Sequence, residues 1–339
     1  MNINSSNPRV LVLGGNQVRW SAKDIPEIKN TMNGVEAWAF TFWGDYRGYG
    51  VLKEKEISEY DIVIANTNFK YFPEYLRFRD KLSKGAKWIA LIEGSASDYL
   101  KPKSIVKQVL DAADVVNCIN RHALPLFKAI TSSRVEYLGI PYPAAGIRKF
   151  EVPFEKRKRE VLICPALTSR WNDYFVAKKL GIEYYGFEQL LSRKIKTLWS
   201  NYSKHGTFSD KRVLFHKTQK EYEDSNLRIV AMTHLDNVFK ITGRSLIWLN
   251  LDDRYTWGRN VLDAAALQIP VISTHSTGHA EDFFPELLVS NEFDIDSAIR
   301  IGKKLLEDKN FYKSIATIPI EKFDHLSHEC MKYKLLSWF

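Results

Sequence analysis

Short apolar runs separated by longer amphipathic stretches recur along the whole chain, and this alternation constrains the fold more than any other feature. The first run is VLVLGG at residues 10–15, and helical patterns follow at residues 71–83 and 103–113. Continuous rather than alternating apolar runs suit strands that are buried on both faces of a parallel sheet. We therefore predict an α/β fold with doubly wound parallel sheets. Further strands are expected at residues 37–41, 62–65, 88–92, 115–119, 135–139, 161–164, 182–187, 229–232, 245–251 and 269–274.

The length of 339 residues predicts more than one domain, because a single core stops growing at roughly 250–300 residues. Pro141, Pro143 and Gly146 are expected to interrupt regular structure and to form a linker. We predict a first domain at 1–150 and a second at 151–317. The apolar positions of 318–339 have helical spacing, so we expect a helix there that packs back on the first domain; a partner-binding or membrane-surface helix is the alternative.

Composition narrows the class of protein. A hydrophobic fraction of 45% and an aromatic fraction of 13% exclude a disordered chain. No apolar run reaches the ~20 residues of a membrane helix, and the first residues lack a signal-peptide pattern, so we expect a cytoplasmic protein. The three cysteines are far apart, and His275 and His279 lie in a loop pattern without acidic ligands. We therefore expect neither disulfides nor a metal site.

The net charge of +9 suggests an anionic partner. Residues 1–150 carry 21 Lys and Arg against 15 Asp and Glu. An acidic acceptor, peripheral contact with an anionic inner membrane face, and DNA would each be attracted by such a field, and a merely basic surface is the alternative. The basic, aromatic stretch 191–220 is expected to be an insertion, either a solvated flap or a surface that stacks on bases or sugars.

The stretch WGRNVLDAAALQIPVIST at residues 257–274 combines a turn, a short helix and a strand. Gly258 permits a tight turn, and Val261 and Leu262 belong to an apolar helical stripe. Asp263 lies in the first turns of that helix, and Pro270 opens the strand. Such a unit can hold the ribose and diphosphate of a nucleotide, although a plain βαβ crossover with a solvated Asp263 is the alternative.

This stretch resembles the donor-site signature of the GT-B glycosyltransferases of the group 1, retaining type. Two departures stand out: Tyr255 occupies the position of the first of the family's two carboxylates, eight residues before Asp263, and Ala166 stands where an arginine is usual. The matching residues are Trp257, Gly258, Leu262, Asp263, Ala264, Pro270, Val271, Ile272, Thr274 and Gly278.

The resemblance implies two Rossmann-like doubly wound domains that face a cleft, with a nucleotide sugar bound to the second. It implies that Asp263 binds the ribose and that His234 lies in the loop that binds the base. Arg170, Arg259 and the amides at Gly258 would neutralise the diphosphate without a metal. No cofactor is expected beyond the nucleotide sugar as co-substrate, and the first strand lacks the full dinucleotide fingerprint.

The first domain is expected to hold the acceptor. Gly14 and Gly15 follow its first strand, and Glu93 and His122 lie at or just beyond strand ends, where ligands of such sheets collect. Glu93 or His122 would orient or deprotonate the acceptor hydroxyl. We therefore expect a glycosyltransferase acting on a glycan or a lipid-linked saccharide. A phage-type glycosyltransferase acting on DNA bases and a nucleotide-sugar-binding protein without turnover are the alternatives.

Overall fold

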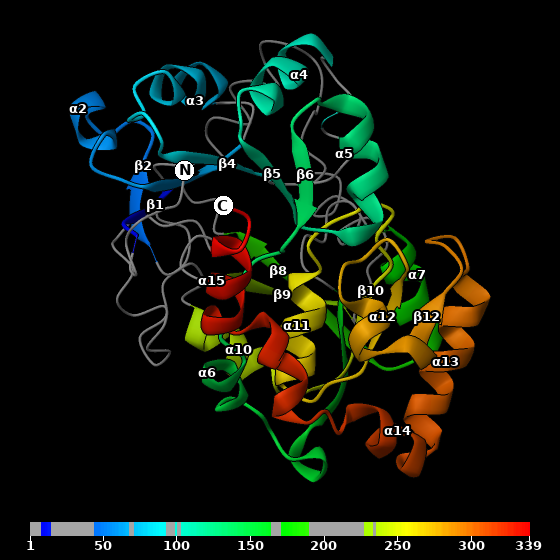
Figure 1. Cartoon of the computed structure of the whole chain (residues 1–339). Helices are drawn as coiled ribbons and strands as arrows, with labels where there is room; N and C mark the ends of the chain where they lie inside the picture. Colours follow the sequence, from blue (N-terminus) through cyan, green and yellow to red (C-terminus); the bar gives the residue numbers. More distant parts are fainter. Residues whose placement is uncertain are drawn as a thin grey trace, which may run out of the picture. The chain divides into compact units, whose positions relative to one another are not determined.

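The computed structural model describes residues 8–14, 44–67, 71–92, 99, 103–163, 171–189, 227–232 and 235–339. The chain forms two compact units. Unit 1 comprises Met1–Ile147, Arg254–Arg259 and Pro319–Phe339, and unit 2 comprises Arg148–Asp253 and Asn260–Ile318 (Figure 1). The second domain expected from the sequence is continuous, whereas in the structure the short segment Arg254–Arg259 groups with unit 1.

Unit 1 contains a six-stranded parallel sheet with the strand order β2-β1-β3-β4-β5-β6. The inner strands are fully buried, which explains why their sequences are continuous apolar runs rather than alternating ones. The strands are β1 (Val10–Gly14), β2 (Asp45–Gly48), β3 (Ile62–Asn66), β4 (Lys87–Leu91), β5 (Val115–Cys118) and β6 (Arg134–Tyr137). The helices are α2 (Glu54–Ile57), α3 (Phe72–Arg79), α4 (Lys103–Asp111), α5 (Leu124–Ile130) and α6 (Ala144–Arg148).

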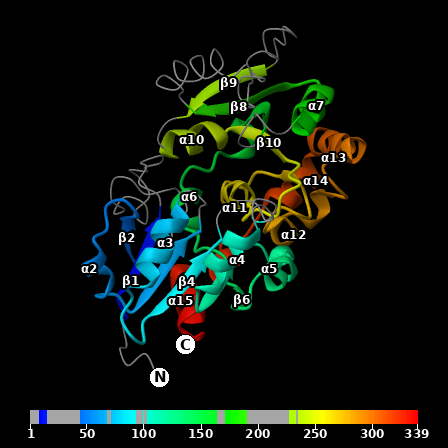
Figure 2. The ribbon, with the colours of Figure 1, turned by 90° about the horizontal axis from the view of Figure 1, so that it is seen from above.

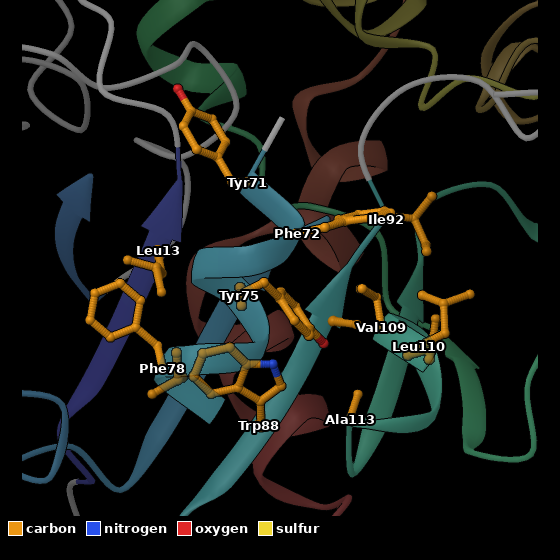
Figure 3. Packing of buried hydrophobic residues seen from close by; sticks show 14 of the residues in the cluster. Leu13, Tyr71, Phe72, Tyr75, Phe78, Trp88, Ile92, Val109, Leu110 and Ala113 are labelled. Carbon is orange, nitrogen blue, oxygen red and sulfur yellow. The ribbon is translucent and has the colours of Figure 1, made fainter. Parts of the chain in front are cut away.

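The core of unit 1 lies where α3 and α4 pack on the sheet (Figure 3). Trp88 of β4 and Tyr75 of α3 are both fully buried, and their rings meet edge to face with centroids 5.1 Å apart. Val109 and Leu110 of α4 complete the cluster. A large aromatic core of this kind makes the sheet a rigid platform for its loops.

Asp111 ends α4 and organises the turn that precedes β6. Its carboxylate accepts hydrogen bonds from the Lys107 ammonium, the Thr131 hydroxyl and the Ser132 amide and hydroxyl. Burial by itself would raise the pKa of Asp111, but these hydrogen bonds outweigh it and lower the pKa to about 2.

The last helix, α15 (His328–Leu336), and the 3₁₀ turns of Ile320–Leu326 belong to unit 1. Phe323 stacks on Tyr142 with ring centroids 5.9 Å apart, and the Leu326 carbonyl accepts a hydrogen bond from the Tyr142 amide at 2.8 Å. Met331 and Leu335 are buried. These residues therefore contribute to the interior of unit 1.

Unit 2 contains a second six-stranded parallel sheet with the order β12-β11-β10-β7-β8-β9. Helices α7 and α13 lie side by side (Figure 2) because Gly302 of α13 has no side chain: a Cβ there would lie 2.8 Å from Leu180 of α7. The strands are β7 (Lys158–Ile163), β8 (Glu183–Gln189), β9 (Leu227–Met232), β10 (Ser245–Asn250), β11 (Val271–Thr274) and β12 (Leu288–Val289). The helices are α7 (Trp171–Leu180), α10 (Leu235–Thr242), α11 (Arg259–Ala266), α12 (Ala280–Phe283), α13 (Ile295–Glu307) and α14 (Lys309–Ala316).

Two local features of the structure differ from the sequence-based expectations. The expected linker around Pro143 and Gly146 forms the short helix α6, because Pro143 precedes its first turn, where proline is tolerated, and the buried Gly146 packs without a side chain. Strand β2 was not expected, since its sequence DYRG is polar and it lies at the sheet edge. The strand expected at 37–41 and the insertion at 191–220 lie outside the described residues.

Candidate active site

The strand order locates one edge of each sheet at which ligands of α/β proteins collect. In unit 2 the chain runs from β7 outward to β8 and β9, then returns to the other side of β7 with β10 and β11. The order therefore reverses between β7 and β10, and the carboxyl ends of these strands form the switch point. In unit 1 the corresponding point lies between β1 and β3, and Gly14 is the last residue of β1.

Buried polar residues cluster at the carboxyl end of β10. Asn250 is the last residue of the strand and is 1% exposed, and Asp252 is 2% exposed. The Asp252 carbonyl accepts hydrogen bonds from the hydroxyls of Thr274, which ends β11, and Ser276, which follows it. The loops after the two neighbouring strands are thereby held together.

Further hydrogen bonds fix the same edge of the sheet. The Asp173 carboxylate of α7 accepts the Leu251 amide at 2.8 Å, which ties the helix after β7 to the end of β10. The Asn250 amide group donates to the Thr277 hydroxyl at 3.3 Å. Because these bonds join elements on both sides of the switch point, they hold its geometry in place before any ligand binds.

Helix α11 carries the acidic residue that the sequence pattern singled out. Gly258 precedes it with φ +80°, in the left-handed region that glycine adopts most easily. Asp263 is only 8% exposed, so it is a buried carboxylate and not a solvated helix residue. It lies in the second turn, and the first turn contains no acidic residue. The helix dipole therefore contributes less at Asp263 than the sequence suggested.

Arg259 is the first residue of α11 and is half-buried. It lies four residues before Asp263, and positions with this spacing share one face of a helix. A cation and a carboxylate on one face, behind a glycine turn, suit a ligand that carries both an anionic group and hydroxyls.

The segment before α11 is anchored within unit 1. The Trp257 ring, 6% exposed, meets Tyr142 edge to face with centroids 6.4 Å apart. The Asn120 amide group donates to the Thr256 carbonyl at 2.8 Å. Tyr255, which replaces the family's first carboxylate, is 43% exposed.

The two histidines each lie beside a carboxylate of the neighbouring helix α12. His275 Nδ1 lies 2.7 Å from Glu281, and His279 Nδ1 lies 3.3 Å from Asp282. His279 is buried and its backbone is left-handed, with φ +64°. Among the residues that the structure describes, no group of three or more His, Cys, Asp or Glu side chains is placed to hold a metal ion.

In unit 1, Gly14 is buried at the end of β1 and its carbonyl accepts the Tyr49 amide at 2.9 Å. His122 is exposed in the 3₁₀ turn before α5, and its amide donates to the Asn120 side chain at 2.9 Å. Burial raises the pKa of the nearby Cys118 thiol to about 12, which makes it unsuitable as a nucleophile. Gly15, Glu93, Arg170 and His234 lie outside the described residues, as does Ala166.

Several polar residues of the unit 2 edge were missed at the level of the sequence. Asn250 directly follows the apolar run SLIWL and Asp252 comes two residues later, so the rule that selected Glu93 would have selected them too. Asp173 carried no such signal, because its importance depends on a contact with Leu251, which lies far away in the sequence.

The two parallel sheets with alternating helices form the α/β, Rossmann-like fold of the GT-B type. No family model matches the sequence, and no curated protein matches it either. Among the described residues, none of the helices is both long enough and apolar enough to span a membrane. The fold assignment therefore depends on the solved structures that the chain resembles.

These structures are glycosyltransferases. Sucrose-phosphate synthase from Thermosynechococcus elongatus is 12% identical, with 98% of each chain covered and a TM-score of 0.63. An α-glucosyltransferase, solved with UDP and a 13-mer DNA containing a central A:G mismatch, is 11% identical over 98% of this chain and 100% of its own, with a TM-score of 0.56. A UDP-forming α,α-trehalose-phosphate synthase from Burkholderia xenovorans, solved with glucose-6-phosphate, is 10% identical over 84% and 74%, with a TM-score of 0.60.

Proposed function

We propose that this protein is a glycosyltransferase of the retaining, group 1 type, which moves a sugar from a nucleotide sugar to an acceptor hydroxyl. The observation that carries the proposal is the buried Asp263 on α11, a helix that a left-handed glycine opens. The polar edge after β10 and β11, at the switch point of the unit 2 sheet, supports it. A buried carboxylate near a phosphate-binding helix start is suited to the hydroxyls of a ribose.

The donor would bind at the polar edge of the unit 2 sheet and at the start of α11. Asp263 accepts hydrogen bonds from the ribose, and His234 contacts the base. Arg170, Arg259 and the amides at Gly258 neutralise the diphosphate as the bond from the anomeric carbon to its oxygen breaks. Cationic side chains and amides would replace a metal in this role, so EDTA should leave turnover unchanged.

Unit 1 would bind the acceptor at the edge where β1 ends in Gly14 and the chain continues with Gly15. The acceptor oxygen forms the new bond to the anomeric carbon, and its proton passes to Glu93, to His122 or to the departing phosphate. A glycan or a lipid-linked saccharide is the acceptor we propose, and a lipid-linked one would bring the basic surface against an anionic membrane.

A thermal-shift panel of nucleotide sugars tests the proposal. A donor at 100 times its dissociation constant stabilises the native state by about 2.7 kcal/mol, which corresponds to a rise in Tm of roughly 5–11 °C for a unit of 150–250 residues. One nucleotide sugar should give this rise, and dinucleotides should give none.

Asp263→Ala should abolish that rise, since it removes the proposed ribose contact. Asp296→Asn, on the exposed face of α13, changes the net charge by the same amount and should leave the rise intact. The absence of a shift with every nucleotide sugar, or an unaltered shift in Asp263→Ala, would refute this assignment. Donor binding without hydrolysis or transfer would instead indicate a binding protein, in line with Tyr255 at the first carboxylate position.

A second candidate function is glycosylation of DNA bases. The net charge of +9 favours it, and the α-glucosyltransferase solved with DNA matches this chain over nearly the full length of both. The prediction is duplex DNA binding in which the logarithm of the association constant falls linearly with the logarithm of salt concentration, because binding releases counterions from the phosphates. Transfer from the same donor to duplex DNA, compared with oligosaccharides and anionic vesicles carrying a lipid-linked sugar, decides among the acceptors.

A further inference from the structure

The carboxyl end of α11 is held by two arginines that the proposed chemistry does not use. A helix leaves its last four carbonyls without partners inside the helix. At the end of α11 two backbone hydrogen bonds form a Schellman motif: the Gln268 amide donates to the Ala265 carbonyl, and the Ile269 amide donates to the Ala264 carbonyl. Gln268 has φ +59°, the left-handed conformation that this motif requires.

Arginine side chains satisfy the carbonyls that remain. Arg148 donates to the Ala266 carbonyl at 2.6 Å, and Arg157 donates to the carbonyls of Leu267 at 3.0 Å and Gln268 at 2.7 Å. Two guanidinium groups at this end also oppose the partial negative charge of the helix carboxyl terminus.

Arg157 connects the helix end to three further parts of unit 2. It donates to the Val152 carbonyl at 2.8 Å and to the Tyr312 hydroxyl at 2.7 Å. Tyr312 is 1% exposed, and its hydroxyl donates in turn to the Leu246 carbonyl of β10 at 2.8 Å, where the register with β7 shifts. One planar side chain thus fixes α11 against both α14 and β10.

Arg148 contacts the places at which the chain enters and leaves unit 2. It is the first residue of that unit, and it donates to the carbonyl of Ile318, its last residue, at 2.9 Å. Its side chain is 20% exposed, so these bonds are largely shielded from water.

We propose that Arg148 and Arg157 are positioning residues that set where α11 places Asp263. Asp263 lies one turn from this end, and its own carbonyl accepts the Leu267 amide at 3.0 Å. A shift of the helix end therefore moves Asp263, and misplacement by about 1 Å costs an enzyme up to roughly a hundredfold in rate. The catalytic consequence rests on the function proposed above; the effect on the position of α11 does not.

The test compares Arg157→Gln, Arg157→Lys, Arg148→Gln and Arg148→Lys with Arg300→Gln, an exposed arginine on α13. The two readouts are the dissociation constant of the nucleotide sugar found by thermal shift and hydrogen exchange of the α11 amides. We expect each Gln variant to weaken donor binding about tenfold and each Lys variant to recover part of the loss. Arg300→Gln should match the wild type.

Hydrogen exchange separates positioning from general destabilisation. Loss of overall stability accelerates exchange in α11 and α13 together, whereas loss of positioning accelerates α11 alone. If a Gln variant does not fold, the Lys variants and Tyr312→Phe, which removes one contact of Arg157, provide the comparison. Wild-type donor affinity together with unaltered α11 exchange in folded variants would overturn the proposal. If the wild-type protein binds no nucleotide sugar, the proposed function fails, and α11 exchange alone decides the positioning.

Discussion

The left-handed turn before α11 allows stability and ligand binding to be separated with a matched pair of variants. Gly258 and Gly85 both have positive φ, +80° and +96°, and both belong to unit 1. An added Cβ costs about 1–2 kcal/mol in this conformation, and the lower freedom of the unfolded alanine chain returns about 0.4–1 kcal/mol. The left-handed backbone alone should therefore cost each Gly→Ala variant about 1 kcal/mol, or roughly 2–4 °C in Tm for a unit of this size.

Only one of the two variants should affect the donor. A Cβ at Gly85 would meet no atom within 4 Å, and the residue lies in the exposed turn before β4. Gly258 sets the direction in which α11 begins, so Gly258→Ala should raise the donor dissociation constant about tenfold. Differential scanning calorimetry measures the first effect and isothermal titration calorimetry the second. Equal donor affinity in the two variants would refute the role of this turn in binding.

Three predictions concern stability. The pKa of Asp111 lies at about 2 in the folded state, below its ordinary value of 3.8, so its contribution to the free energy of unfolding is present above about pH 4 and lost as the pH falls toward 2. Allowing for solvent screening, urea titrations should show that the wild-type protein loses about 1 kcal/mol more unfolding free energy over that pH interval than Asp111→Asn. Gly243→Ala should destabilise unit 2 by more than 2 kcal/mol, because the new Cβ would lie 2.6 Å from the Phe150 carbonyl oxygen. A Tm equal to that of the wild type would contradict this close approach of Gly243 to Phe150. Gln268→Gly should raise the unfolding free energy by about 0.5–1 kcal/mol, because glycine removes the left-handed strain and the backbone carbonyl of residue 268, which Arg157 binds, remains. A lower Tm would show that the Gln268 side chain is needed for stability.

The alternating architecture could be predicted because buried parallel strands must be apolar along their whole length. The apolar runs IVIA in β3 and LIWL in β10 carry that requirement in the sequence, and polar residues occur only at the ends of these strands. The edge strand β2 does not carry it, since a strand with one paired side tolerates polar residues such as those of DYRG. Helix α6 was missed because a proline directly before a helix and a proline inside one look alike in a local pattern.

The candidate site could be predicted only where backbone geometry selects a residue type. The sequence singled out Gly258 because a tight turn favours glycine, which agrees with its left-handed φ, and it singled out Asp263 by its place on the helix that follows; their role in binding stays a prediction. The contacts of Asp173, Arg148 and Arg157 join residues that lie roughly 80 to 170 positions apart. Such partners are set by tertiary packing, and a single sequence holds no local trace of them.

The path of the chain through the two units has a consequence for biosynthesis. Because unit 1 takes in Arg254–Arg259 and Pro319–Phe339, a ribosome that has made the first 147 residues has not yet made all of it. Until residues 319–339 have been synthesised, the surface that Phe323, Leu326, Met331 and Leu335 later cover stays exposed and can bind chaperones. Expression of residues 1–147 alone should accordingly give an aggregation-prone fragment, and supplying residues 319–339 as a separate peptide should improve its recovery.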